Sequence, residues 1–291
     1  RTFRRDPLRA IRAAQFAARL EFAIAPETMA LCRTLDLGGL ARERVMGEME
    51  KALTRSRRPS RCFEALREMG QLEPWLKEVA ALIGVKQRAD CHPEGDAWTH
   101  TMLVVDEAAK LRDEAKNPTG LMLAALLHDV GKAVAMQEKD GVIHAYGHET
   151  AGVPLAEEFL RRLTGEKALC RYVLNMVELH MKPNMYAAQN SGQKAWNRLF
   201  DRSVCPEDLL LLAKADHRGR INAAPYAETE RTIRARLSAY EEMMTRPHIT
   251  GADLLARGIQ PGAEMGRLLE EAHRLRLAGV KKEDALRQMR L

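Results

Sequence analysis

The sequence lacks several features that mark common classes of protein. Aromatic residues make up only 5% of the 291 residues, and no apolar run reaches the length of about 18 residues expected of a membrane-spanning helix. The five cysteines are widely spaced and include no C-x-x-C pair, which argues against a disulfide framework and a zinc ribbon. Neither a G-x-G-x-x-G string nor a P-loop is present, which argues against a glycine-rich phosphate cradle. These absences predict a cytoplasmic protein with reduced thiols and no membrane segment.

The residues that are abundant favour helices. Leu, Ala, Glu, Arg and Met are frequent, and a hydrophobic fraction of 46% is enough to bury a sizeable core. The net charge of +6 favours a polyanionic partner, although with 30% charged residues the excess could equally serve solubility. We therefore expect an all-α protein of one large or two modest domains.

The first twenty residues predict a helix with two different faces. The chain begins at Arg1 without an initiator Met, which indicates a start inside a longer protein. Asp6 as N-cap and Pro7 at the first helical position predict a helix over residues 7–20. Its basic face carries Arg5, Arg9, Arg12 and Phe16. Its narrower apolar stripe consists of Leu8, Ile11, Ala14 and Ala18.

A second basic cluster surrounds Pro59. It consists of Arg55, Arg57, Arg58 and Arg61. Two interpretations stay open at this point, a solvated loop and a patch that contacts phosphate groups.

The strongest chemical signal is a histidine next to an aspartate at the end of an apolar helix. The string LMLAALLHDVGK is apolar on most sides and is therefore expected to be buried, yet it ends in His128 and Asp129. Burying both groups requires partners, and a divalent cation supplies them, because imidazole nitrogen and carboxylate oxygen both bind metal ions. Gly131 is expected to stop the helix and to leave the pair facing a cleft.

The same combination of a polar residue and an apolar helix recurs along the chain. It is found at His100, His148, His180 and Asp216. Each residue alone could be a hydrogen-bonded core or capping group, but together they indicate a metal site. The other histidines, among them His92, His217 and His273, show no comparable pattern, and we do not assign them to the site.

The string from His128 to Lys132, His-Asp-Val-Gly-Lys, resembles the HD phosphohydrolase superfamily in its version with extra histidines. The resemblance implies a first metal ion on His100, His128, Asp129 and Asp216. It implies a second ion on Asp129, His148 and His180. The implied catalytic residues are His128, Asp129 and Lys132; Lys132 would stabilise phosphate, unless it is only a cation at the end of a helix. One or two ions of Mn, Ni, Fe, Co or Mg suit such ligands better than a structural zinc does.

The first string of the chain resembles a second family. Arg4-Arg5-Asp6-Pro7-Leu8-Arg9, followed by Ile249-Thr250-Gly251-Ala252-Asp253-Leu254 near the end, is similar to bacterial tRNA nucleotidyltransferases, the CCA-adding enzymes and poly(A) polymerase relatives. The resemblance implies that Asp6 and Arg9 bind a nucleotide base, with Arg12 on the same face. The family usually has Glu where this chain has Arg5.

Several members of that family carry an HD domain after a helical neck and body. We therefore expect three parts: a neck and body over residues 1–80 that binds nucleotide and tRNA, an HD bundle over residues 81–245, and a helical appendage over residues 246–291. The turn that begins at Asp90 and contains Cys91 marks the first boundary. The family's catalytic head, with its glycine-rich motif and paired carboxylates, has no counterpart in this sequence, so the chain by itself is not expected to add nucleotides.

Two functional hypotheses follow. The first is a metal-dependent phosphohydrolase that acts on 2′,3′-cyclic or terminal phosphates of nucleotides or RNA, within a protein of tRNA 3′-end CCA addition or repair. The alternative is a tRNA-binding body with a vestigial HD site. A purely structural helical protein is disfavoured, because it would bury several polar groups without chemical purpose.

Overall fold

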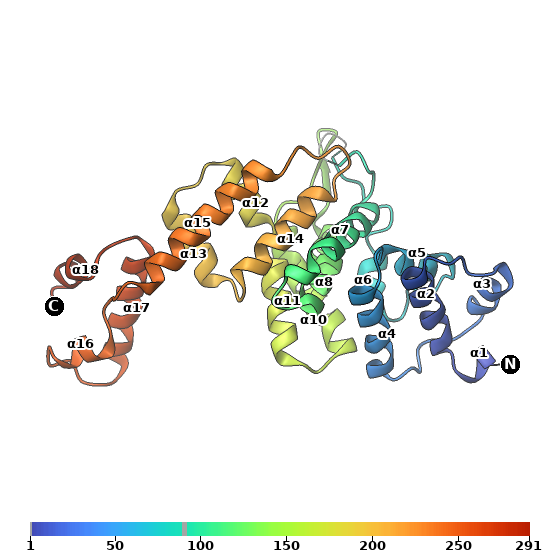
Figure 1. Cartoon of the computed structure of the whole chain (residues 1–291), viewed down its shortest axis with the longest axis horizontal. Coiled ribbons are helices and arrows are strands. Elements are labelled where there is room, and N and C mark those ends of the chain that lie inside the picture. The colour runs from blue at the N-terminus through green and yellow to red at the C-terminus, as the bar shows by residue number, and fades with distance from the viewer. Residues whose placement is uncertain (1, 89–91) are drawn as a thin grey trace. The chain divides into compact units, whose positions relative to one another are not determined.

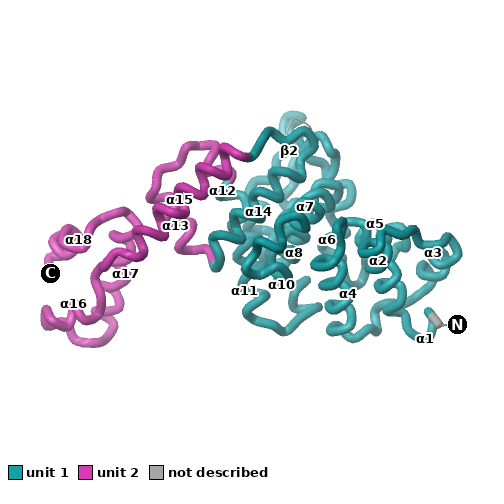
Figure 2. The backbone as a smooth tube through the Cα atoms, viewed as in Figure 1, with its two compact units in different colours: residues 1–183, 204–226 teal, residues 184–203, 227–291 magenta. Residues whose placement is uncertain are grey.

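The structure is a computed structural model that describes residues 2–88 and 92–291. Cys91 and Asp90, in the turn expected between the first two domains, lie outside the described residues. The chain forms two compact units, the first of residues 1–183 and 204–226 and the second of residues 184–203 and 227–291 (Figure 2).

Helices dominate both units, which confirms the expected all-α class (Figure 1). The helices of the first unit are α1 (Thr2–Arg5), α2 (Leu8–Leu20), α3 (Pro26–Cys32), α4 (Arg42–Arg55), α5 (Ser60–Glu68), α6 (Lys77–Ala80), α7 (Ala97–Leu111), the 3-10 turn η1 (Arg112–Glu114), α8 (Pro118–Leu127), α9 (Lys132–Ala135), α10 (His148–Leu163), α11 (Lys167–Leu179) and α14 (Pro206–Arg218). Those of the second unit are α13 (Gln193–Arg202), α15 (Ala227–Thr245), α16 (Gly251–Leu255), α17 (Ala263–Leu277) and α18 (Lys282–Gln288), and α12 (Met181–Ala188) spans the boundary. No helix in the described part of the chain is both long and apolar enough to cross a membrane.

Helix α2 follows the pattern of its sequence, except at its start. The apolar stripe is buried at Leu8, Ile11, Ala14 and Ala18, and it packs against α4 and α5. The N-cap prediction for Asp6 is wrong, because Pro7 occupies the cap position and no side chain caps the helix. The Asp6 carboxylate instead accepts hydrogen bonds from the Arg44 guanidinium, with both N–O distances 3.0 Å.

Helix α8 is the buried centre of the first unit. Every side chain from Leu121 to Leu127 is fully buried, as its apolar sequence predicts. It packs against α4, α7, α11 and α14. Asn117 caps its first turn by accepting from the Gly120 amide at 2.9 Å. Because α8 packs against these helices along its length, its C-terminal end lies inside the bundle.

Gly131 has a different role from the helix stop that we predicted. Helix α8 already ends at Leu127, and Gly131 has an ordinary helical φ of −67° at the cap of α9. A Cβ atom there would lie 2.0 Å from the His148 carbonyl oxygen and 2.5 Å from the Gly152 nitrogen. Glycine is therefore required because the turn after α8 presses directly against α10.

A short hairpin lies between α9 and α10. Strands β1 (Gln137–Lys139) and β2 (Val142–His144) pair antiparallel, with Lys139 opposite Val142. Asp140 and Gly141 form the two-residue turn and both have positive φ, 53° and 74°, as such turns require. Residues 2–88 and 92–291 contain no other sheet.

The compact units differ from the three expected parts at both boundaries. Helix α4 packs against α8 and α10, and α6 packs against α10, so the first 80 residues share one unit with the HD helices. In the second unit, α16, α17 and α18 share a core that includes Leu254, Ala272 and Ala285. Three functional parts with ends at residues 80 and 245 remain a proposal about function.

Candidate metal centre

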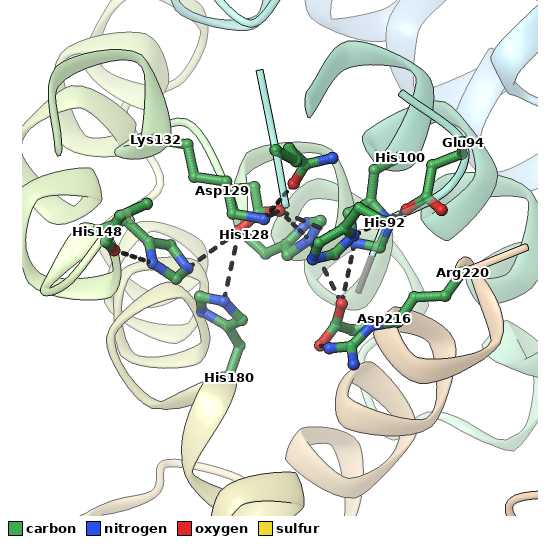
Figure 3. Close-up of polar contacts among 12 residues, drawn as sticks. His92, Glu94, His100, His128, Asp129, Lys132, His148, His180, Asp216 and Arg220 are labelled. Carbon is green, nitrogen blue, oxygen red and sulfur yellow. Dashed lines mark hydrogen bonds and ion pairs between the residues drawn. The ribbon is translucent and has the colours of Figure 1, made fainter. Parts of the chain in front are cut away.

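Six polar side chains from successive helix ends meet inside the first unit (Figure 3). Each of them is at most 6% exposed. They are His100 in the first turn of α7, His128 and Asp129 just after α8, His148 at the start of α10, His180 just after α11, and Asp216 in the last turn of α14. The structure therefore brings together all six side chains that the sequence suggested as metal ligands.

The first group forms around His100, His128 and Asp216. The His100 Nε2 atom lies 3.0 Å from Asp216 Oδ1, and His128 Nε2 lies 4.0 Å from the same oxygen. Asp129 Oδ2 borders this group, 3.2 Å from His128 Nε2 and 3.8 Å from His100 Nε2.

The second group lies on the other side of Asp129. Its Oδ1 atom is 3.1 Å from His148 Nε2 and 3.7 Å from His180 Nε2. Figure 3 shows the His148 and His180 rings facing Asp129 from one side, and His100 and His128 lying on the other. Asp129 thus offers one oxygen to each group.

Backbone carbonyls orient three of the four imidazole rings. His128 Nδ1 donates to the Ala125 oxygen at 2.9 Å, His148 Nδ1 to the Ala145 oxygen at 2.8 Å, and His180 Nδ1 to the Val177 oxygen at 2.7 Å. These bonds keep the proton on Nδ1 and leave the Nε2 lone pair directed at the centre, which is the tautomer that binds a metal.

The atoms that face the centre lack hydrogen-bond partners. Within the described residues, the Nε2 atoms of His128, His148 and His180 are buried without a hydrogen bond. Such orphaned atoms are costly unless something binds them. A divalent cation fits this donor set of neutral imidazoles and carboxylates, with no thiolate among them.

Electrostatics favours charged carboxylates and, at His180, a neutral ring. Burial alone would raise the pKa of Asp129, but His128 and Lys132 hold it well below the usual value. The pKa of Asp216 is also lowered, because the hydrogen bond from His100 and the charge of Arg220 outweigh burial. Burial lowers the pKa of His180 to about 3. Carboxylate and neutral imidazole are the forms that bind metal.

Two residues that sequence reasoning missed complete the surroundings of His100. The Glu94 Oε1 atom lies 2.8 Å from Nδ1 of His100 and 2.8 Å from Nδ1 of His92. Burial would raise the pKa of Glu94, but its contacts with the two histidines lower it to about 2. Both residues lie in the turn before α7, where no helical period marks them. The only available signal was the short spacing within His92-Pro93-Glu94.

Lys132 lies beside the centre rather than at the end of a helix. It is the first residue of α9, so the interpretation as a helix C-terminal cation is wrong. Its Nζ atom is 2.6 Å from Asp129 Oδ2 and donates to Gln87 Oε1 at 2.6 Å. A positive charge is therefore held against the shared carboxylate.

A cavity of about 300 Å³ opens beside these groups. Asp129, His148 and Asp216 line it, and so does Lys132. Further cationic side chains around it are Lys86, Arg88 and Arg220. A cavity of this size accommodates a small ligand such as one nucleotide, and its positive lining favours an anion.

The residues expected to bind a nucleotide base lie at α2, and only one of them lacks an ion pair. Arg9 is exposed and has no partner among the described side chains. Asp6 pairs with Arg44, and Arg12 donates to the buried carboxylate of Glu48 at 2.9 Å. Base binding through Asp6 and Arg12 would therefore compete with ion pairs that are already formed.

Two models of known protein families match segments of the chain. The HD domain model matches residues 97–239, and a model described as the probable RNA and SrmB-binding site of polymerase A matches residues 21–83. The chain is therefore a helical protein in which an RNA-binding-type segment precedes an HD domain.

Curated relatives identify the family. The chain is 34% identical over 295 residues to the multifunctional CCA protein of Actinobacillus pleuropneumoniae, covering 96% of this chain and 68% of that protein. It is 37% identical over 291 residues to the multifunctional CCA protein of Burkholderia lata, covering 96% of this chain and 66% of the relative. The chain belongs to the family of multifunctional CCA proteins, which confirms the resemblance drawn from its two motifs.

A solved structure shares the fold. The Thermotoga maritima CCA-adding enzyme complexed with tRNA matches with a TM-score of 0.52 at 14% identity, over 99% of this chain and 62% of that one. The chain thus spans about two thirds of the length of its curated relatives and less of this structural neighbour.

Proposed function

We propose that this chain is a metal-dependent phosphohydrolase that acts on 2′,3′-cyclic or terminal phosphates of nucleotides and of RNA 3′ ends. The observation that carries the proposal is the set of buried, unpartnered Nε2 atoms around Asp129. An ordinary core would pair these atoms, whereas a catalytic centre leaves them free for an ion.

His100, His128, Asp129 and Asp216 would hold a first divalent ion, and Asp129, His148 and His180 a second. When bound, such ions supply Lewis acidity toward a phosphoryl oxygen and lower the pKa of water. Mn, Ni, Fe, Co and Mg are the candidates that suit the ligands.

The remaining residues of the cavity bind and orient the substrate. Lys132 keeps its ammonium group beside Asp129, where it neutralises part of the negative charge of a phosphate ester. Arg220 lies at the other side of the cavity, 3.6 Å from Asp216 Oδ2, and attracts the same anion.

The test is hydrolysis of 2′,3′-cyclic AMP by the purified chain with Ni, Mn, Co or Mg. We expect hydrolysis with at least one ion and its loss in His128→Ala and Asp129→Ala. His273→Ala is the matched control, because His273 pairs with Asp201 in the second unit. Inactivity with every ion, or full activity in the two site variants, would refute the proposal.

A second candidate function is binding of RNA through the first unit, with tRNA as the partner. The polymerase-type RNA-binding match at residues 21–83 supports it, as do the names of the relatives. The two functions are compatible, since one surface would hold the RNA body and the cavity would receive its end. Salt-independent binding of tRNA would count against this candidate.

A further inference from the structure

We infer that Tyr146 is a stacking platform for a nucleobase at the mouth of the metal cavity. This inference rests on the proposed function and concerns how the base of its nucleotide substrate is held. It assigns a binding role to a side chain that neither the ligand pattern nor the HD motif includes.

Tyr146 is exposed to an unusual degree for an aromatic residue. Its exposed fraction of 83% is the largest among the large apolar side chains of the described residues. Its hydroxyl group has no hydrogen-bond partner within residues 2–88 and 92–291. Folding of the chain therefore gains little from this side chain, which leaves its ring available to a ligand.

The ring is nevertheless held in place. It stacks on the His144 imidazole, with centroids 4.9 Å apart and planes inclined by 18°. His144 is the last residue of strand β2, so the hairpin positions the imidazole on which Tyr146 stacks. One face of Tyr146 is covered, and its high exposure leaves the other face open.

The backbone links this platform to the metal centre. Ala145, next to Tyr146, provides the carbonyl that fixes His148 Nδ1 at 2.8 Å. Gly147 then turns the chain with a φ of 74°, a conformation that favours glycine. The turn directs His148 to the buried centre while Tyr146 lines the cavity from outside.

The chemistry of the cavity matches a nucleotide. The cationic side chains of Lys86, Arg88 and Arg220 line the cavity and would attract a phosphate ester. The open face of an aromatic ring such as Tyr146 binds a base by stacking. Stacking of a base on an aromatic side chain adds to affinity without preference for one sequence. A sugar phosphate without a base would lose this contribution.

The test compares a nucleotide with a sugar phosphate that lacks the base. Binding of AMP and of ribose 5-phosphate is measured by titration calorimetry for the wild type and for Tyr146→Ala, Tyr146→Phe and Phe22→Ala. Phe22 is 67% exposed but does not line this cavity, so it serves as the matched control. We expect Tyr146→Ala to weaken AMP binding about tenfold. Ribose 5-phosphate binding should not change, and Tyr146→Phe should behave like the wild type.

The outcomes separate this inference from the proposed function. Selective loss of AMP affinity in Tyr146→Ala supports the platform even if the wild type hydrolyses no phosphate ester. Unchanged AMP affinity overturns the platform even if hydrolysis is robust. An equal loss for both ligands also overturns it, because it would indicate disturbance of His148 rather than a missing stack.

Discussion

Asp129 and His148 approach each other to 3.1 Å, while the second oxygen of Asp129 lies 2.6 Å from Lys132. The same carboxylate therefore belongs to the group of His148 and His180 and also contacts Lys132, and its second oxygen borders the other group, 3.2 Å from His128 Nε2. His148 belongs to only one of the two groups. Variants of Asp129 and of His148 should therefore differ in how much metal they bind.

Replacement of Asp129 by Asn should abolish binding at both metal positions, whereas His148→Ala should affect one. We expect activity to fall on the order of a hundredfold or more in Asp129→Asn, because a metal-dependent reaction cannot proceed without its ion. Metal content per chain, measured by mass spectrometry after dialysis, checks the prediction. Equal metal content in the two variants would contradict the sharing of Asp129.

Glu94→Gln should weaken metal binding although it replaces none of the proposed ligands. Glu94 contacts His100 Nδ1 at 2.8 Å, and such partners of metal-binding histidines typically contribute about 10–100-fold in affinity or activity. Competition with a chelator gives the affinity. Glu114→Gln, at an exposed residue of η1, is the control and should behave like the wild type. Identical chelator curves for both variants would exclude a role of Glu94.

Gly131→Ala should destabilise the first unit and damage the centre together. The added Cβ would lie 2.0 Å from the His148 carbonyl oxygen, so α10 must shift and carry its ligand with it. Overpacking of this kind costs about 1–3 kcal/mol. Gly47→Ala is the matched control, because nothing lies within 4 Å of its Cβ in α4; it should stabilise by up to about 1 kcal/mol. Chemical unfolding with metal analysis of the folded variant provides both readouts.

The contrast at Gly131 shows what sequence can and cannot predict here. The apolar sequence of α8 predicts that the helix is buried. His128 and Asp129 at its end are then buried too, so they need other polar residues as partners. The tight contact with α10 involves residues 17 and 21 positions further along, and no local pattern specifies it. Sequence therefore predicted which six side chains meet, but gave a wrong reason for the glycine.

Segments with few apolar residues were the least predictable. Helix α15 buries only Ile233 and Leu237 along its 19 residues, so its sequence has little amphipathic signal. Helix α15 was not expected, and neither was α13, although α13 buries Trp196, Leu199 and Phe200 on one face. In the same way, Glu94 and the ion pair of Asp6 with Arg44 depend on residues brought together only by folding.

Charge reversal at Arg57 and Arg218 should weaken tRNA binding. Both are exposed, neither has an ion-pair partner in the described part of the chain, and both line one cleft of about 750 Å³ that also includes Arg220. If each contacts a phosphate, each reversal should reduce the slope of log affinity against log salt by about 0.7–0.9. Arg171→Glu, at an exposed residue of α11 outside this cleft, is the control. Unchanged slopes would support the solvated-loop interpretation of the cluster around Pro59.

The second unit should lose stability in acid through Asp253. The Lys282 ammonium group and donors of Thr250 hold the pKa of Asp253 below its usual value. A lowered folded-state pKa gives stability that is present above the unfolded value of about 3.9 and is lost as the pH falls below it. Protection factors from hydrogen exchange in α16 and α18 should decrease between pH 5 and pH 2.5. This decrease should be smaller in Asp253→Asn, and an equal decrease in Asp253→Asn would assign the effect to other groups.

Three of the four imidazoles take their orientation from a carbonyl only three residues earlier in the chain, at Ala125, Ala145 and Val177. The orientation of each of these rings thus depends on a residue close in sequence, within a helix for His128 and His180 and in the turn before α10 for His148. Replacement of one of these histidines should leave the other rings in their orientation, so one ligand can be lost without a change in the fold around the rest. His100 is the exception, because its second nitrogen depends on a carboxylate from the preceding turn. Loss of the Glu94 carboxylate would therefore disturb the orientation of His100 while the other three rings keep theirs.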